Sequence, residues 1–265
     1  MQHRLRLVFI CGILLILSSY LCKAETTTIY FYAPETNINN FVVLKNMFTQ
    51  YVLQFGDYIV QPINDPMIIK QTMRDNHSWI MIISSTIYKK ITQDIPLTPL
   101  MVMSKDDSIL MKDIIVYKKN SGKEKLLNGC VLASSRPKGY IDQALTSFPN
   151  EINRNKTKIV IVPRDMDALM SIVLDVAQVA LVSEDSLLKL SKLNATQEQN
   201  IARINAGKKM LRPILAVSKQ SPINYQRLVS IFQSMDTDPK AQPLCQLLGM
   251  TKWQNLSNDD KKLLD

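Results

Sequence analysis

Short apolar segments alternate with segments of helical spacing along most of this chain, and this alternation most constrains its fold. Residues 79–83 read WIMII and residues 158–162 read KIVIV. Runs of this kind are typical of parallel strands that helices cover on both faces of a sheet. Between such runs, apolar side chains recur every three or four residues, as at Phe41, Leu44 and Phe48. The pattern predicts an α/β fold.

The alternation is interrupted at two places. Residues 101–103 and 113–117 both read as strands with no helix between them, and the strand at 213–217 has no helix directly before it. We therefore predict two α/β lobes joined by two crossing strands, near residues 104–113 and 204–212. The predicted division is 25–107 for the first part of lobe 1, 108–205 for lobe 2, and 206–265 for the return strand and C-terminal helices of lobe 1. Within lobe 1 we predict helices at 66–73, at 222–235 with Ser221 as its cap, and at 243–248 closed by Gly249, and we expect Trp253 to pack on this lobe.

The first 24 residues have the pattern of a secretory signal. Two arginines precede an apolar stretch at residues 7–17, which is short for a membrane helix. The small side chain of Ala24 suits a signal peptidase, so we predict cleavage before Glu25 and a periplasmic protein. A retained membrane anchor and a lipid-modified Cys22 are the alternatives.

Charge and cysteine content narrow the partners. The whole chain has a formal net charge of +9, and the signal segment contributes three of its cations and no acid, leaving +6. The Lys and Arg residues are scattered, so we predict no nucleic-acid partner. The surplus fits either an anionic ligand or a solvated basic surface. Cys130 and Cys245 remain after cleavage, and we expect two buried thiols in different lobes. His77 is the one histidine left, which argues against a transition-metal site.

Residues 114–145 suggest a site for an anion. A strand at 114–117 is followed by a turn, a strand at 130–133, a polar loop and a helix that starts near Tyr140. The NH groups at the start of a helix lack partners, and the helix dipole is positive there. The candidate ligand-binding residues of this segment are Ser134, Ser135, Arg136, Lys138, Gly139 and Tyr140.

The same segment resembles phosphonate-type substrate-binding proteins of ABC transporters. The matching parts are residues 119–122, 127–129 and 134–140, together with 165–169, 176–180, 202–204 and 212–215. The resemblance implies the type II periplasmic binding protein fold and a small-molecule ligand held in the cleft between two lobes. It further implies a monomer without a cofactor, and an ABC permease in the inner membrane, or a membrane sensor, as the partner.

The chain departs from that family where the ligand would bind. The family's loop is a run of serine and threonine ending in serine-glycine, whereas Pro137 and Lys138 stand in its second half here. Pro137 lacks an NH donor. Arg136 and Lys138 could replace that donor by charge, or both could point to solvent. Ala177 or Gln178 replaces the family's glycine in the second lobe, so the turn there must differ.

Further candidates follow from topology, because ligands of open α/β sheets bind at the carboxyl ends of the strands. The residues selected in this way are Tyr32, Ser84, Ser85, Tyr88 and Ser183. We expect Ser84, Ser85 and Tyr88 to close over the Ser134 loop from the other lobe. Ser85 or Thr86 could instead cap the following helix. Glu35 could repel an anion, bind an amine or be a solvated loop acid.

These observations favour a binding protein over an enzyme. No serine lies in a nucleophile elbow, and no metal-ligand spacing is found. We predict a periplasmic solute-binding protein that captures a small anionic ligand, similar to phosphonate or phosphate, and delivers it to an ABC permease. The alternative is a binding module of the same fold for an apolar or lipid ligand, or for sensing through a separate membrane partner; the 13 methionines leave an apolar cleft open.

The signal pattern gives the first testable prediction. We expect the mature protein to begin at Glu25 and to be recovered from the periplasm, because the basic and apolar segments would be removed on export. N-terminal sequencing of the protein from each cell fraction checks this. Recovery of the chain from the membrane fraction with Met1 still present would contradict it.

Overall fold

The computed structural model describes residues 26–65, 67–69, 71, 79–122, 129–146, 152–219 and 223–264. The predicted signal at 1–24 lies outside the described residues, as does most of the helix predicted at 66–73. Within the described ranges, no helix combines the length and the apolar character needed to cross a membrane.

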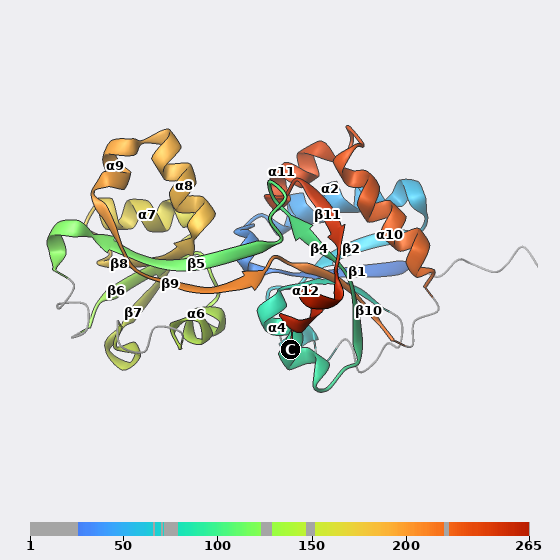
Figure 1. The fold of residues 1–265 in the computed structure, drawn as a ribbon, viewed down its shortest axis with the longest axis horizontal. Coiled ribbons are helices and arrows are strands. Elements are labelled where there is room, and N and C mark those ends of the chain that lie inside the picture. Colours follow the sequence, from blue (N-terminus) through green and yellow to red (C-terminus); the bar gives the residue numbers. More distant parts are fainter. Residues whose placement is uncertain are drawn as a thin grey trace, which may run out of the picture.

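Lobe 1 contains a six-stranded sheet (Figure 1). Its strands lie in the order β11 (Lys252–Asn255), β4 (Leu97–Ser104), β10 (Ile214–Ser218), β3 (Ile80–Ile83), β1 (Thr27–Tyr32) and β2 (Tyr58–Pro62). Strand β1 is parallel to β2 and β3, whereas β10 is antiparallel to both β3 and β4. The chain therefore returns to this sheet in the opposite direction after it has formed the second one.

Lobe 2 contains a five-stranded sheet. Its strands lie in the order β7 (Lys158–Ile161), β6 (Val131–Ser134), β8 (Val179–Ser183), β5 (Leu110–Lys118) and β9 (Ile201–Leu211). Strand β6 is parallel to β7 and β8, whereas β5 is antiparallel to β8 and β9. The carboxyl ends of β6, β7 and β8 thus lie at one edge of this sheet.

Helices cover both faces of each sheet, as the strand pattern predicts. The helices of lobe 1 are α2 (Phe41–Val52), α4 (Ser85–Thr92), α10 (Tyr225–Gln233), α11 (Gln242–Leu248) and α12 (Asn258–Lys262), with the 3-10 turns η1 (Pro34–Thr36), η2 (Leu53–Phe55) and η5 (Ser234–Asp236). Those of lobe 2 are α6 (Lys138–Leu145), α7 (Asp165–Val173), α8 (Glu184–Leu193) and α9 (Ala195–Gln199), with η3 (Lys119–Ser121) and η4 (Arg154–Lys156).

The core of lobe 1 is built on β3, whose four residues are all fully buried. On one face of the sheet, Phe232 of α10 packs edge-to-face against Phe48 of α2 and Trp253 of β11, with ring centroids 6.0 and 5.1 Å apart. Burial of these rings contributes to the apolar core on this face. Trp253 was predicted to pack on lobe 1, which is confirmed, although the sequence did not predict that its segment would form strand β11.

Two short segments connect the lobes, residues 105–109 and Arg212–Pro213. They lie beside each other, because Arg212 N donates to Ile109 O (2.8 Å) and Met103 N donates to Pro213 O (2.9 Å). In Figure 1, β5 and β9 run along lobe 2 toward these connections. Since β9 pairs with β5 as far as Leu211, the chain changes sheet a few residues after the boundary predicted at 205.

Two predicted helix ends can be compared with the structure. The helix predicted at 222–235 begins later, at Tyr225, because the Asn224 side chain accepts a hydrogen bond from Arg227 N and caps it. The predicted cap at Ser221 lies outside the described residues. Gly249 ends α11, as predicted, with a left-handed φ of 65° that glycine adopts without a steric cost.

Candidate functional site

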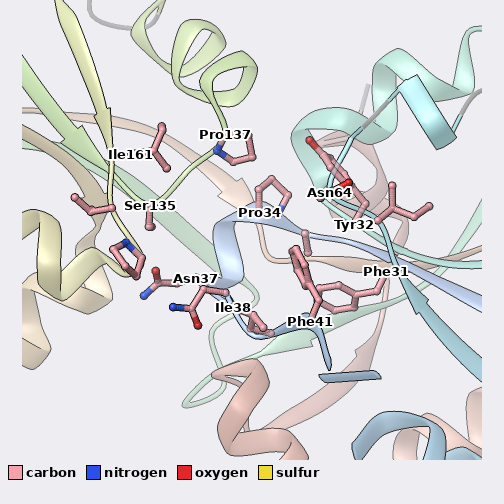
Figure 2. Close-up of a pocket in the computed structure, with 15 residues that line it drawn as sticks. Phe31, Tyr32, Pro34, Asn37, Ile38, Phe41, Asn64, Ser135, Pro137 and Ile161 are labelled. Carbon is pink, nitrogen blue, oxygen red and sulfur yellow. The ribbon is translucent and has the colours of Figure 1, made fainter. Parts of the chain in front are cut away.

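A cavity of about 430 Å³ lies between the two lobes (Figure 2). Pockets of this size are typical of sites for small molecules. The residues that line it are Phe31, Tyr32, Ala33, Pro34, Asn37, Ile38, Asn39, Phe41, Ile63, Asn64, Ser135, Pro137, Ile161, Val162 and Pro163.

The walls of the cavity come from the carboxyl ends of parallel strands in both sheets. Residues 33–41 follow β1, residues 63–64 follow β2, Ser135 and Pro137 follow β6, and residues 162–163 follow β7. Ligands of α/β sheets bind at these ends, because the loops that follow parallel strands converge there. The cavity is therefore in the position that the topology of both lobes favours for a ligand.

Apolar side chains form most of the lining, and its polar groups are uncharged. Three asparagines, the Tyr32 hydroxyl and the Ser135 hydroxyl supply the hydrogen-bonding groups. No charged residue lines the cavity among those that the structure describes.

Asn37 connects the lobes beside the cavity. Its backbone has a left-handed φ of 64°, which asparagine adopts more readily than most residues. The backbone N of Asp165, the first residue of α7 in lobe 2, donates to Asn37 Oδ1 (3.0 Å). This bond gives a partner to an NH group at a helix start that would otherwise lack one.

A buried ionic network lies directly behind the Ser135 wall. Arg136 is fully buried, and its guanidinium contacts Asp165 through Nη1 and Asp113 through Nη2, the latter at 3.2 Å. The Tyr140 hydroxyl donates to Asp113 Oδ2 (2.7 Å), and the Ser135 hydroxyl donates to Asp165 Oδ1 (2.6 Å). The backbone N of Ser183 donates to Asp165 Oδ2 (2.9 Å).

The network holds its three charged groups in place without leaving a cation for a ligand. Burial by itself would lower the pKa of Arg136, but Asp165 and Asp113 raise it above its ordinary value. Burial alone would raise the pKa of Asp165, yet Arg136 and the hydroxyl of Ser135 keep it below its usual value. Burial raises the pKa of Asp113, against the effect of Arg136. One guanidinium thus faces two carboxyl groups.

The structure brings only part of the predicted site together. Tyr32 and Ser135 line the cavity. Arg136 was predicted either to compensate an anion or to point to solvent, and it does neither, because two aspartates bind it inside lobe 2. Lys138 and Gly139 are exposed at the start of α6, and Tyr140 is buried against Asp113.

The remaining predicted hydroxyls are bonded within the protein. Ser134 Oγ donates to Leu181 O (2.9 Å), Ser85 Oγ to Leu211 O (2.6 Å), and the Tyr88 hydroxyl to Leu97 O (3.1 Å). Ser84 is fully buried, and its Oγ lies 2.9 Å from Thr86 Oγ1. Ser183 caps α8 by accepting from Ser186 N. These residues do not line the cavity, so the predicted closure of Ser84, Ser85 and Tyr88 over Ser134 is not what the structure shows.

Glu35 differs most from its expectation as a solvated loop acid. Only 4% of its surface is exposed, and its Oε2 has no hydrogen-bond partner among the described residues. Burial raises its pKa to about 7, and Asp113 of lobe 2 adds to the increase, while Ser84 and Arg136 oppose it. The pKa of Glu35 therefore depends on Asp113 and Arg136 in the other lobe.

Four residues of the site were not predicted from the sequence: Asn37, Asn64, Asp113 and Asp165. Asn64 follows β2 in the same way that Tyr32 ends β1, so the rule of strand ends could have selected it. Asp165 opens one of the segments that match the family, and its charge was the available signal. Asp113 gave no signal of its own, because only the pairing of β5 with β8 places it near Arg136.

Two α/β lobes, two connecting segments and a cavity at the strand ends are the architecture of the type II periplasmic binding protein fold. No profile of a known protein family matches this sequence, and no curated protein matches it. Solved structures do match. XAC2383 from Xanthomonas citri, bound to ATP, is 14% identical with a TM-score of 0.66, over 90% of this chain and 94% of that one.

Two phosphonate-related binding proteins match similarly. A binding protein component of an ABC phosphonate transporter from Pseudomonas aeruginosa is 12% identical, with a TM-score of 0.63, over 88% of this chain and 82% of that one. PhnD1 from Prochlorococcus marinus, in complex with methylphosphonate, is 12% identical, with a TM-score of 0.61, over 89% and 94%. The predicted fold class is confirmed, and the resemblance to phosphonate-type binding proteins is confirmed as a likeness of fold.

Replacement of Arg136 tests whether its role is structural. We expect Arg136→Ala to lower the free energy of unfolding by about 3 to 5 kcal/mol, because Asp113 and Asp165 would be left buried without a countercharge. Urea unfolding measures this. Lys138→Ala, two positions away and exposed, is the matched control and should change stability by less than about 0.5 kcal/mol. Equal stability of the two variants would contradict the burial of Arg136.

Glu35 predicts a dependence of stability on pH. The pKa of the Glu35 carboxyl group is 4.5 in the unfolded chain, and burial raises this pKa to about 7 in the folded protein. As the pH rises, the unfolded chain therefore releases this proton first. Stability from this group is full below pH 4.5 and is lost by pH 7, a change of roughly 3 kcal/mol. The free energy of unfolding of Glu35→Gln, minus that of the wild type, should therefore increase by that amount across the interval.

Urea unfolding at several pH values measures this difference. Glu198→Gln in α9 of lobe 2 is the control, and it should follow the wild-type pH profile. If Glu35→Gln also follows the wild-type profile, Glu35 is not buried in the folded protein.

Proposed function

We propose that this protein is an exported solute-binding protein that captures a small molecule between its two lobes and delivers it to a permease in the membrane. The observation that carries this proposal is the cavity itself, whose walls come from strand ends of both sheets. A molecule bound there would contact both lobes at once. The predicted signal at residues 1–24 supports export.

Movement of the lobes follows from how they are connected. Each lobe has its own hydrophobic core, and within the described part of the chain only residues 105–109 and Arg212–Pro213 pass between the sheets. Rotation about such a pair of segments opens and closes a cleft without unfolding either lobe. The bond from Asp165 to Asn37, and that from Lys90 Nζ to Gln143 Oε1 (2.9 Å), join the lobes and would break on opening.

A ligand that touches both walls would shift this equilibrium toward the closed form, because it gains contacts that the open form lacks. The closed form would then present a surface for the permease that the open form does not. Sensing through a separate membrane partner would use the same capture and closure. In the structures with this fold, XAC2383 holds ATP and PhnD1 holds methylphosphonate, so the fold accommodates small molecules.

The ligand class that the sequence favours is a phosphonate- or phosphate-like anion. Its support is the order of the segments at 119–122, 127–129 and 134–140, which matches the phosphonate-type proteins. The buried state of Arg136 weakens that support, because the strongest cation of the loop is already paired.

Two preparations test whether the protein captures a small molecule. One is purified natively, and the other is unfolded in guanidinium, dialysed to remove any ligand and refolded. We expect mass spectrometry to detect a small molecule released by the native preparation. Small-angle scattering should give a larger radius of gyration for the stripped protein, with an unchanged circular dichroism spectrum, because the lobes separate without unfolding. An unchanged radius of gyration, despite calorimetric binding of the released molecule, would contradict closure between the lobes.

A further inference from the structure

We propose that the cavity between the lobes selects an uncharged, largely apolar molecule with a few hydrogen-bonding groups, and rejects phosphonate-like anions. This inference rests on the proposed function, since it names the class of ligand for the same cavity. It departs from the anionic class that the sequence favours. Three features support this proposal: the apolar walls of the cavity, the small number of free groups that could hold an anion, and the acids near Tyr32.

Large apolar side chains remain exposed on both walls. Ile161, at the end of β7, is 55% exposed, and Phe41, at the start of α2, is 37% exposed. Figure 2 shows Ile161 and Pro137 on the lobe 2 side of the hollow, and Phe41 and Ile38 on the lobe 1 side. Exposed apolar groups that surround a hollow mark a binding surface for an apolar body.

Several of the groups that usually hold an anion are absent or already bonded. Three of the lining residues are Pro34, Pro137 and Pro163, which have no backbone NH to donate. Pro137 is also the N-cap residue of α6, so the N-cap position of that helix has no NH to donate to an anion. The guanidinium of Arg136 is bound by Asp113 and Asp165. An anion in the cavity would therefore lose its hydration without a charged partner among the described residues.

Two acids lie near Tyr32, on the lobe 1 side of the cavity. The pKa of Tyr32 is raised to about 12, mainly by burial and in addition by the nearby carboxyl groups of Glu35 and Asp65. These acids oppose a second negative charge in the cavity. They do not form a site for an organic cation either, because neither of them lines the cavity.

The polar groups that do line the cavity suit an uncharged ligand. The side-chain amides of Asn37, Asn39 and Asn64 each have both donor and acceptor atoms, and the hydroxyl of Tyr32 can donate or accept. The hydroxyl of Ser135 donates its proton to Asp165, so it can only accept from a ligand. They can satisfy hydroxyl, amide or carbonyl groups of a ligand without a charge on either side.

A smaller cavity of about 280 Å³, also lined by Asn37, contains the cationic side chains of Lys105, Lys189 and Arg212, two of which are paired with an acid. Lys105 Nζ and Arg212 Nη2 lie 3.2 and 2.9 Å from Asp185 Oδ2. Both charges are thus shared with one carboxylate. The buried Glu35 lines the same cavity and adds an acid to it.

Direct binding measurements on the stripped exported protein decide the class. The uncharged fluorescent probe N-phenyl-1-naphthylamine should bind saturably, with one site per protein. Inorganic phosphate, methylphosphonate and choline should neither displace the probe nor raise the melting temperature. The molecule released by the native protein should be uncharged.

A charged substitution in the cavity wall tests whether the probe binds in this cavity. Ile161→Lys should weaken binding of the probe at least tenfold, because it puts an ammonium group against the apolar wall. Val176→Lys is the matched control: Val176 is 61% exposed in the same lobe and does not line the cavity, so probe binding should not change. Equal affinity of the two variants would place the probe elsewhere and overturn the assignment.

The outcomes separate the ligand class from capture itself. Displacement of the probe by phosphate or methylphosphonate, or tighter binding of choline, would overturn the uncharged class while leaving capture between the lobes intact. If no probe binds and the native protein releases no small molecule, capture fails, and the ligand class fails with it.

Discussion

The interaction on which the site depends is the pairing of Arg136 with Asp113 and Asp165 inside lobe 2. Asp113 lies on β5, Arg136 follows β6, and Asp165 begins α7, so one guanidinium ties together three separate parts of the lobe. A buried charge without a partner would cost several kcal/mol, so these parts must adopt their positions together. The loop that carries Ser135 and Pro137 is thereby fixed as a wall of the cavity.

The same pairing decides what the wall can offer a ligand. A free arginine after β6, at a strand end and before a helix, would favour an anion. With both its terminal nitrogens bound by aspartates, the arginine becomes part of the scaffold, and uncharged amides, hydroxyls and apolar side chains face the cavity instead. A likeness of fold to proteins that bind phosphonates or ATP is therefore compatible with a different ligand, because the ligand is chosen by side chains at the strand ends.

Glu35 extends this network across the boundary between the lobes. It belongs to η1 of lobe 1, yet Asp113 and Arg136 of lobe 2 both act on its pKa. Proximity of the lobes therefore influences the charge of this carboxyl group. Contact between the lobes therefore depends on polar groups of the protein, including the bond from Asp165 to Asn37, as well as on a ligand.

The sequence by itself determined the α/β class, the two changes of sheet, the buried thiols of Cys130 and Cys245 and the end of α11 at Gly249. These features depend on local periodicity, side-chain polarity and backbone conformation, which are written in neighbouring residues. Only the tertiary structure decided that Arg136 is paired with buried aspartates, that Glu35 is buried and that Asn37 accepts a hydrogen bond from Asp165. Those facts join residues far apart in the chain, and a charged side chain looks the same in a sequence whether it faces a ligand, the solvent or a buried partner of opposite charge.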